Sequence, residues 1–403
     1  MSATSRQRLL LVISLPMIIA SARADDSQWR VSGNVALQSR VFFQDPLWVG
    51  QDPSTVQWSV SAEPEFRWRS KSGDQRASII AFGRVDDTDE KRTHADLREG
   101  YWANEGDSVE FLIGVNKVFW GVTESRHLVD IINQTDRVED IDQEDKLGQP
   151  MVNLSLQQDW GLLDFYALPY FRERTFPGVE GRFRLPLPID SDNSVYESDE
   201  GQSHTDFALR YSHYLDTVDF GVYYFTGTSR APRFVVASDG SSFIPHYDLI
   251  DQVGLDLQYT KEALLWKLET IVRSGFNETF EAAVGGFEYS FYGVSESAAD
   301  VGLLMEYQYD NRSIFEPPTL ADNDLFVGTR LALNDVQDTA LLAGVVYDTQ
   351  TSETYINIEA ERRIGDNVVL ELRARAITRT SPTDVGYAIS KDDYVQIQLS
   401  RFF

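Results

Sequence analysis

Charged side chains alternate with aliphatic ones near the end of the chain. Glu371, Arg373 and Arg375 lie two residues apart, and Glu359 and Glu361 have the same spacing just upstream. Residues two apart share one face of a β-strand, and opposite charges on neighbouring strands can pair. We therefore predict cross-strand ion pairs between the two glutamates and the two arginines.

The residue types that commonly carry out catalysis lack a catalytic arrangement here. There is no cysteine, no G-x-S-x-G sequence and no H-x-x-x-H sequence, so neither a zinc site nor an activated serine is indicated. The acidic clusters at 86–90 and 136–145 are interpreted as solvated loops rather than calcium sites. We expect no enzymatic activity, no metal and no cofactor.

Strict alternation of apolar and polar residues recurs along the chain and predicts strands. Eighteen such segments lie between Trp29 and Phe403, joined by connections that are alternately tight and long. Trp58 and Trp68 lie ten residues apart on one face, which in a tilted strand spans about 25 Å, the height of a membrane's apolar band. Pro64 lies on the same face and cannot donate a ladder hydrogen bond, so we predict a bulge there.

These features predict an all-β protein: a single transmembrane antiparallel β-barrel of about 18 strands, with 16 as the alternative. Residues 1–24 have the charged start, apolar run and A-x-A site of a signal peptide, which assigns 25–403 to the barrel. The tight turns and both termini are expected in the periplasm, with long extracellular loops. Barrel closure should bring Phe403 next to Trp29.

Net charge and segment type limit the partners and the location. The formal charge is −27, which argues against nucleic-acid binding. We expect a protein of the bacterial outer membrane, in contact with the lipid bilayer, lipopolysaccharide and small solutes. The oligomeric state is left open.

Two stretches resemble known proteins. The last strand, ending in Phe403, resembles the C-terminal signature of bacterial outer-membrane barrels. Leu97–Asp136, with Arg98-Glu99-Gly100-Tyr101, Trp120-Gly121 and the Asp130–Asp136 segment, resembles an uncharacterised group of proteobacterial outer-membrane barrels related to porins and alginate-export channels. The resemblance implies that loop 120–150 folds into the lumen and narrows it, with Trp120, Asp130, Asn133 and Asp136 as constriction residues.

Directing the apolar faces to lipid leaves charged residues in the lumen. They either stiffen the wall as ion-pair ladders or form a transverse field that sets selectivity, and both readings stay open. The expected function is a porin-like channel for passive passage of small polar or amphipathic solutes; the alternative is an export channel or scaffold component for an acidic polymer. The predicted channel-lining residues are Glu63, Glu65, Arg67, Arg69, Arg84, Arg98, Arg210, Arg273, Arg330, Glu359, Glu361, Glu371, Arg373 and Arg375.

A basic stretch, Pro169–Pro186, interrupts this acidic chain. Its arginines, among them Arg172, Arg174, Arg182 and Arg184, could bind an anionic substrate or lipopolysaccharide phosphates, because guanidinium forks match such groups. Alternatively, they pack against the acids that follow, from Asp190 to Glu200. We favour the packing interpretation.

Overall fold

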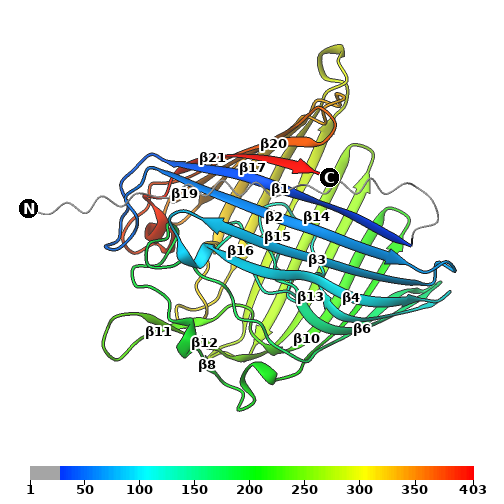
Figure 1. Cartoon of the computed structure of the whole chain (residues 1–403), viewed down its shortest axis with the longest axis horizontal. Helices are drawn as coiled ribbons and strands as arrows, with labels where there is room; N and C mark the ends of the chain where they lie inside the picture. Colours follow the sequence, from blue (N-terminus) through cyan, green and yellow to red (C-terminus); the bar gives the residue numbers. More distant parts are fainter. Residues whose placement is uncertain (1–27) are drawn as a thin grey trace, which may run out of the picture.

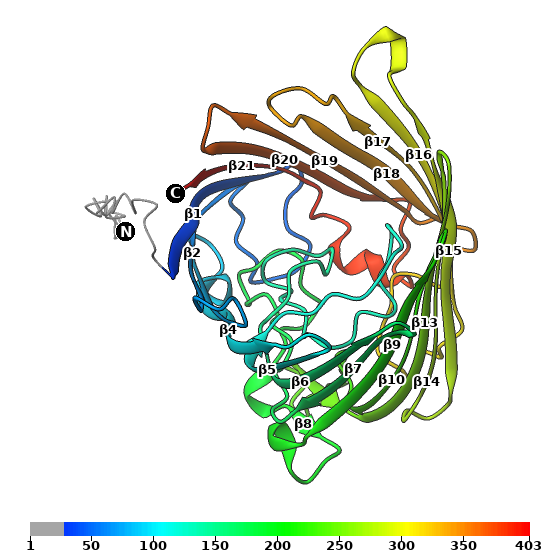
Figure 2. The same ribbon diagram turned by 90° about the vertical axis from the view of Figure 1, so that its right-hand side faces the viewer.

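The protein folds as one closed barrel of eighteen antiparallel strands (Figures 1 and 2). The computed structural model describes residues 28–403, and the predicted signal peptide lies outside them. Within these residues there is no helix both long and apolar enough to cross a membrane. The barrel strands are β1 (Trp29–Phe42), β2 (Val56–Arg69), β3 (Gln75–Asp86), β4 (His94–Glu105), β5 (Val109–Asn116), β6 (Gln149–Gln158), β7 (Gly161–Leu168), β9 (Asp206–Leu215), β10 (Val218–Thr228), β13 (Leu249–Lys261), β14 (Leu264–Ser274), β15 (Phe280–Phe291), β16 (Asp300–Asp310), β17 (Asn323–Ala332), β18 (Ala340–Asp348), β19 (Thr354–Ile364), β20 (Val368–Thr378) and β21 (Tyr394–Phe402).

The strand faces follow the predicted alternation. On β1, Val35 and Leu37 are more than two-fifths exposed, whereas Gln38 and Arg40 are almost fully buried. A wall that exposes its aliphatic residues and buries its polar ones is the reverse of a water-soluble sheet and suits a lipid surround. The prediction of an all-β barrel with eighteen strands is confirmed.

The first and last strands close the barrel. Strand β1 pairs with β21 from Asn34 opposite Phe402 to Phe42 opposite Tyr394. Phe403 exchanges two backbone hydrogen bonds with Gly33, at 3.2 and 3.0 Å. Trp29, which was expected to lie next to Phe403, is instead four residues before Gly33 on β1, because tilted barrel strands are staggered on closure.

The connections divide the barrel into two ends. The short-turn end carries the turns at 70–74, 106–108, 159–160, 216–217, 262–263, 292–299, 333–339 and 365–367, and it is where β1 starts and β21 ends. The long-loop end carries the other connections, among them 117–148, 169–205, 229–248, 311–322 and 379–393. The sequence did not indicate the small sheet of β8 (Val195–Tyr196), β11 (Arg233–Val236) and β12 (Phe243–Tyr247) within two of these loops.

The bulge predicted at Pro64 is wrong. The pairing of β2 with β3 is interrupted there but resumes in the same register, with Ala62 opposite Gly83 and Glu65 opposite Ile80. The register shifts instead between β3 and β4, which leaves Arg98 as the extra residue. A bulge re-aims side chains, and here Arg98 and Glu99 both turn inward, although they are consecutive.

One side of the interior is packed with apolar side chains. Loop 117–148 contributes Trp120, Val129, Ile131 and Ile132, all at most 5 % exposed, and they pack against inward residues of the wall between β4 and β15. Figure 2 shows this connection between β5 and β6 inside the ring of strands. One side of the barrel is therefore filled by its own loop.

A glycine at the end of β5 allows the close approach of β4. Gly114 has φ +136°, and a Cβ there would lie 2.3 Å from the carbonyl oxygen of Gly100. We expect Gly114→Ala to lower the free energy of unfolding by about 1–3 kcal/mol, through backbone strain and this clash. Urea unfolding followed by tryptophan fluorescence measures the change. Gly83→Ala on β3 is the matched control, since its Cβ would meet open space; an equal loss in both variants would contradict the explanation.

Candidate functional site

The connection 117–148, termed the inward loop below, is closed at its neck by one side chain. The Asn133 Oδ1 accepts a hydrogen bond from the Val118 amide at 2.8 Å, and its Nδ2 donates to the carbonyl oxygens of Asn116 and Leu147, both at 2.9 Å. Asn133 is 1 % exposed. It therefore holds the start and the end of the loop together inside the barrel.

Trp120 packs the inward loop against the wall, whereas Asp130 binds within the loop. The Trp120 ring lies 4.9 Å from the ring of Tyr223 and 4.9 Å below the guanidinium of Arg210. Asp130 forms an ion pair with Lys146 at 2.9 Å. Aromatic and cation–π contacts of this kind stabilise buried positions, so Trp120 anchors the loop to the wall. The Asp130–Lys146 pair joins the two halves of the loop to each other.

Asp136 binds the arginine that the bulge turns inward. Its Oδ2 accepts from the Arg98 Nη2 at 2.7 Å and lies 3.3 Å from the His94 Nε2, while its Oδ1 accepts from the Thr175 hydroxyl at 2.7 Å. Burial raises the pKa of Asp136, but His94 and Arg98 outweigh it and hold the pKa at about 2. The carboxylate is thus charged at any physiological pH.

His94, Asp136 and Glu139 lie within 4.8 Å of one another and are of the types that bind metal ions. Each carboxylate already has an arginine partner, because Arg84 binds Glu139 at 2.7 Å and Arg98 binds Asp136. A metal ion would have to displace these guanidinium groups. The three side chains therefore form an ion-pair network with Arg84 and Arg98 instead of a metal site.

The tip of the inward loop binds the last strands of the barrel. Asp140, 3 % exposed, accepts from Arg373 at 2.9 Å and from the Tyr394 hydroxyl at 3.2 Å, and it lies 3.3 Å from Arg375. Burial raises the pKa of Asp140, but the arginines outweigh it and hold the pKa well below its ordinary value. The neighbouring Asp142 binds Arg375 at 2.7 Å.

The predicted cross-strand ion pairs form only in part. Arg375 binds Glu359 at 2.9 Å, as expected. Glu361 lies opposite Glu371 instead of an arginine. The other partners of the two arginines are loop carboxylates some 230 residues earlier, which strand spacing alone cannot reveal.

Two wall carboxylates bind the backbone of the inward loop. The Glu269 Oε1 on β14 accepts from the Val122 and Thr123 amides at 2.7 and 3.0 Å. The Glu306 carboxylate on β16 accepts from the amides of Glu124 and Ser125, both at 2.8 Å. The sequence marks both glutamates as inward charges, but their role as loop acceptors depends on the path of the loop. Together with Arg373 and Arg375 they fix the loop across the interior.

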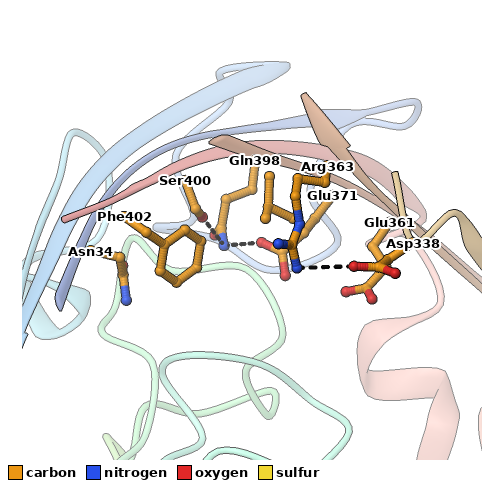
Figure 3. Close-up of a pocket in the computed structure, with 9 residues that line it drawn as sticks. Asn34, Asp338, Glu361, Arg363, Glu371, Gln398, Ser400 and Phe402 are labelled. Atoms are coloured by element: carbon orange, nitrogen blue, oxygen red, sulfur yellow. Dashed lines mark hydrogen bonds and ion pairs between the residues drawn. The ribbon is translucent and has the colours of Figure 1, made fainter. Parts of the chain in front are cut away.

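Two cavities, together termed the passage below, lie along the inner face of the wall from β16 to β21. A cavity of about 650 Å³ lies beside β16–β20 and reaches Glu353 at the long-loop end. A second cavity, of about 300 Å³, continues to Phe402 at the short-turn end (Figure 3). Glu361 and Glu371 line both cavities, so the two adjoin along the height of the wall.

The passage is acidic. Nine carboxylates and four arginines line the larger cavity. All four arginines, Arg126, Arg330, Arg373 and Arg375, bind carboxylates. Within residues 28–403, Glu361 has no hydrogen-bond or ion-pair partner, while Glu371 accepts from Gln398 (Figure 3). Burial and then the nearby Asp384 and Asp348 raise the pKa of Glu353 to about 7, which reflects crowding of negative charge at this end.

The predicted channel-lining residues separate into two groups. Arg330, Glu359, Glu361, Glu371, Arg373 and Arg375 line the passage. The other eight lie elsewhere on the wall. Four are on β2 (Glu63, Glu65, Arg67 and Arg69), where Arg67 contacts Glu65 and Arg69 contacts Glu105. Arg84 and Arg98 bind the inward loop, Arg210 binds Asp256, and Arg273 donates to Gln252.

The basic stretch is packed, although its partners differ from those expected. Arg172 binds Asp96 on β4 at 2.7 Å, and Arg182 binds Asp392 near β21 at 2.5 Å. The expected partners were the acids from Asp190 to Glu200. These arginines therefore join their loop to distant strands instead of to the acids that follow them.

No family model and no curated protein matches this chain. Solved structures do match. Wzi, an outer-membrane protein involved in group 1 capsule assembly in Escherichia coli and a carbohydrate-binding β-barrel, is 10 % identical, with a TM-score of 0.53 over 93 % of this chain and 84 % of its own. Pseudomonas aeruginosa OpdQ is 12 % identical, with a TM-score of 0.53 over 94 % and 98 %. Pseudomonas aeruginosa OccK3 (OpdO) is 10 % identical, with a TM-score of 0.53 over 93 % and 95 %.

These likenesses show the fold. The chain has the closed β-barrel fold of these outer-membrane proteins, as its alternating strands predict. The proteobacterial origin and the relation to alginate-export channels, expected from Leu97–Asp136, stay predictions.

The contacts of Asp140 make it a test of loop attachment. We expect Asp140→Asn to lower the free energy of unfolding by about 2 kcal/mol, because buried hydrogen bonds to charged groups are lost. Urea unfolding measures the effect. The control is Asp338→Asn, whose exposed carboxylate forms one ion pair with Arg363 and should change stability by less than about 0.5 kcal/mol. Equal stability of the two variants would show that the loop is held by other contacts.

Asp145 makes stability depend on pH. Burial and then Glu139, Asp142 and Asp140 raise its pKa to about 7, so the folded state retains a proton that the unfolded chain has already lost. Stability should fall as the pH rises from about 4 to about 7. We expect Asp145→Asn to remove this loss and to be more stable than the wild type at pH 8 by about 1 kcal/mol or more.

Unfolding in urea at pH 4.5 and pH 8 measures the difference between the two proteins. Other groups titrate equally in both and cancel. The control is Asp159→Asn, in an exposed turn. Its free energy of unfolding should differ from that of the wild type equally at both pH values. If the difference in free energy of unfolding between the wild type and Asp145→Asn does not increase from pH 4.5 to pH 8, the raised pKa of Asp145 is refuted.

Proposed function

We propose that this barrel is a passive, porin-like channel for small polar solutes, with a preference for cations. The acidic passage between the inward loop and β16–β21 carries the proposal, because its nine carboxylates outnumber its four arginines. Charged rings in a narrow pore set ion selectivity, and a cleft lined by one sign of charge concentrates the opposite ion.

The inward loop sets the cross-section of the passage. Its apolar side, with Val129 and Ile132, is packed against the wall, which leaves solutes only the opposite side. There the loop presents Glu124, Asp142 and Glu144 to the cavity. A solute therefore passes between an acidic loop edge and an acidic wall, which favours small, hydrated and positively charged molecules.

The orientation follows from the connections. In barrels of this kind the long loops are extracellular and the short turns periplasmic. Both ends of the barrel sequence would then lie on the periplasmic side, and the acidic mouth at Glu353 would face the exterior. We assign the chain no catalytic role, and the lipid bilayer and lipopolysaccharide are its proposed surroundings.

Export of an acidic polymer is the less favoured function. Wzi, which shares the fold and is a carbohydrate-binding barrel, is the observation that supports this alternative. However, Arg373 and Arg375, the proposed anionic track, are bound to Asp140 and Asp142. Their charge is already neutralised by the protein's own carboxylates.

Reversal potentials in planar bilayers under a salt gradient test the proposal. The wild type should conduct and prefer cations. We expect the double variant Glu361→Gln/Glu371→Gln to lower this preference by about two- to tenfold, because it removes two charges where the two cavities meet.

The matched control is Asp107→Asn/Asp216→Asn, which removes the same charge from two turns outside the passage. It should retain the wild-type reversal potential. Absence of conductance at every salt concentration, or a preference for anions in the wild type, would overturn the proposal.

A further inference from the structure

A separate cavity opens at the long-loop end and is rich in arginine. It encloses about 270 Å³ between the inward loop and the loops 169–205, 229–248, 311–322 and 379–393. Seven arginines and one lysine line it, against three carboxylates. The sign of its charge is therefore opposite to that of the passage and of the chain as a whole.

Several of these arginines form no ion pair. Within residues 28–403, Arg137, Arg174 and Arg273 have no carboxylate within ion-pairing distance. Arg174 donates only a long hydrogen bond to Gln134, at 3.4 Å, and Arg273 donates to Gln252 at 2.5 Å. The Arg137 guanidinium has no hydrogen-bond acceptor in this part of the chain. Guanidinium groups that line a cavity and have no carboxylate partner are available to an anion.

A fourth arginine has an unused donor. Arg230 is only 7 % exposed; its Nη1 binds Asp206 at 2.7 Å and its Nε donates to the Ile131 carbonyl oxygen at 3.1 Å. Its Nη2 is buried and has no partner. Buried donors are rarely left unsatisfied, so this nitrogen marks a place where an acceptor is missing.

The two loop arginines also influence each other. Burial lowers the pKa of Arg137 and outweighs the nearby Asp142 and Asp140, which raise it. Burial and then the nearby Arg137 lower the pKa of Arg174 to about 10. Two like charges held this close in a partly enclosed space favour a bound anion between or beside them.

The rest of the cavity wall is apolar. Phe176 and Phe234 meet edge to face with their ring centroids 5.6 Å apart, and both line the cavity together with Leu185 and Leu320. Ligand sites commonly combine an apolar wall with a few oriented polar groups and have volumes of about 300–1,000 Å³. The present cavity is near the lower limit, which suits a single ring.

We propose that this cavity is a binding site for a small organic anion, namely a carboxylate carried on an apolar ring. The guanidinium groups of Arg137 and Arg174 bind the carboxylate, and the phenylalanine rings contact the body of the ligand. Arg230 and Arg273 line the same cavity and add positive charge to its wall. The cavity shares Arg126 and His127 with the passage, so the ligand binds next to the route of the small cations.

Calorimetric titration of the full chain in lipid nanodiscs tests the site, with sodium benzoate, acetate and inorganic phosphate as probes. Benzoate should bind saturably. Acetate should bind about tenfold or more weakly, because it lacks a ring to bury. Phosphate binding as tight as that of benzoate would overturn the proposed apolar ligand, and so would equal binding of acetate. The measurement does not require conductance, so it is independent of the channel proposal.

Charge-removing variants locate the site. Arg137→Gln/Arg174→Gln should weaken benzoate binding by about tenfold or more, while Arg137→Lys/Arg174→Lys retains part of the affinity. The control, Arg30→Gln/Arg401→Gln, removes two exposed arginines near the short-turn end and should bind benzoate like the wild type. Neither loop arginine has an ion pair, so the first variant should unfold at an unchanged or higher temperature. No saturable benzoate binding, or unaltered binding in that variant, would refute the proposal.

Discussion

The attachment of loop carboxylates to wall arginines determines the interior of this barrel. Asp136, Glu139 and Asp140 are each at most 5 % exposed and each meets an arginine on a strand. A buried charge without a partner costs several kcal/mol, so neither the loop nor the wall could retain these groups without the other. The loop therefore has one position, and the shape of the remaining space follows from it.

This attachment divides the interior into regions of different character. Trp120, Val129 and Ile132 fill the side toward β4–β15 with apolar contacts. The other side keeps an acidic passage, and the mouth contains a basic cavity. The two regions of opposite sign adjoin along the inward loop, because Arg126 and His127 line both. The net charge of −27 is therefore unevenly distributed: the passage is acidic and the cavity at the mouth is basic.

The sequence predicted the wall much better than the interior. Period-two alternation is a local property, and each of the eighteen segments carries it, so the strands and the closure could be derived. The entry of the loop into the lumen was implied by a resemblance alone, because many of its partners lie on distant strands, for example 38 and 233 residues away. Pro64 was a plausible bulge on chemical grounds, yet the extra residue is Arg98, whose inward direction is fixed by Asp136. The small sheet of β8, β11 and β12 was missed because its strands have two to five residues and little alternation.

The contacts of Arg373 and Arg375 also bear on the order of folding. These residues lie on β20, and they bind carboxylates 233 positions earlier in the chain. Contacts of such long range form late, because the intervening chain must first be ordered. A barrel still lacking its last hairpin would hold Asp140 and Asp142 without these arginines. The complete set of loop contacts therefore requires β20 to be in place, next to the strand that closes the barrel against β1.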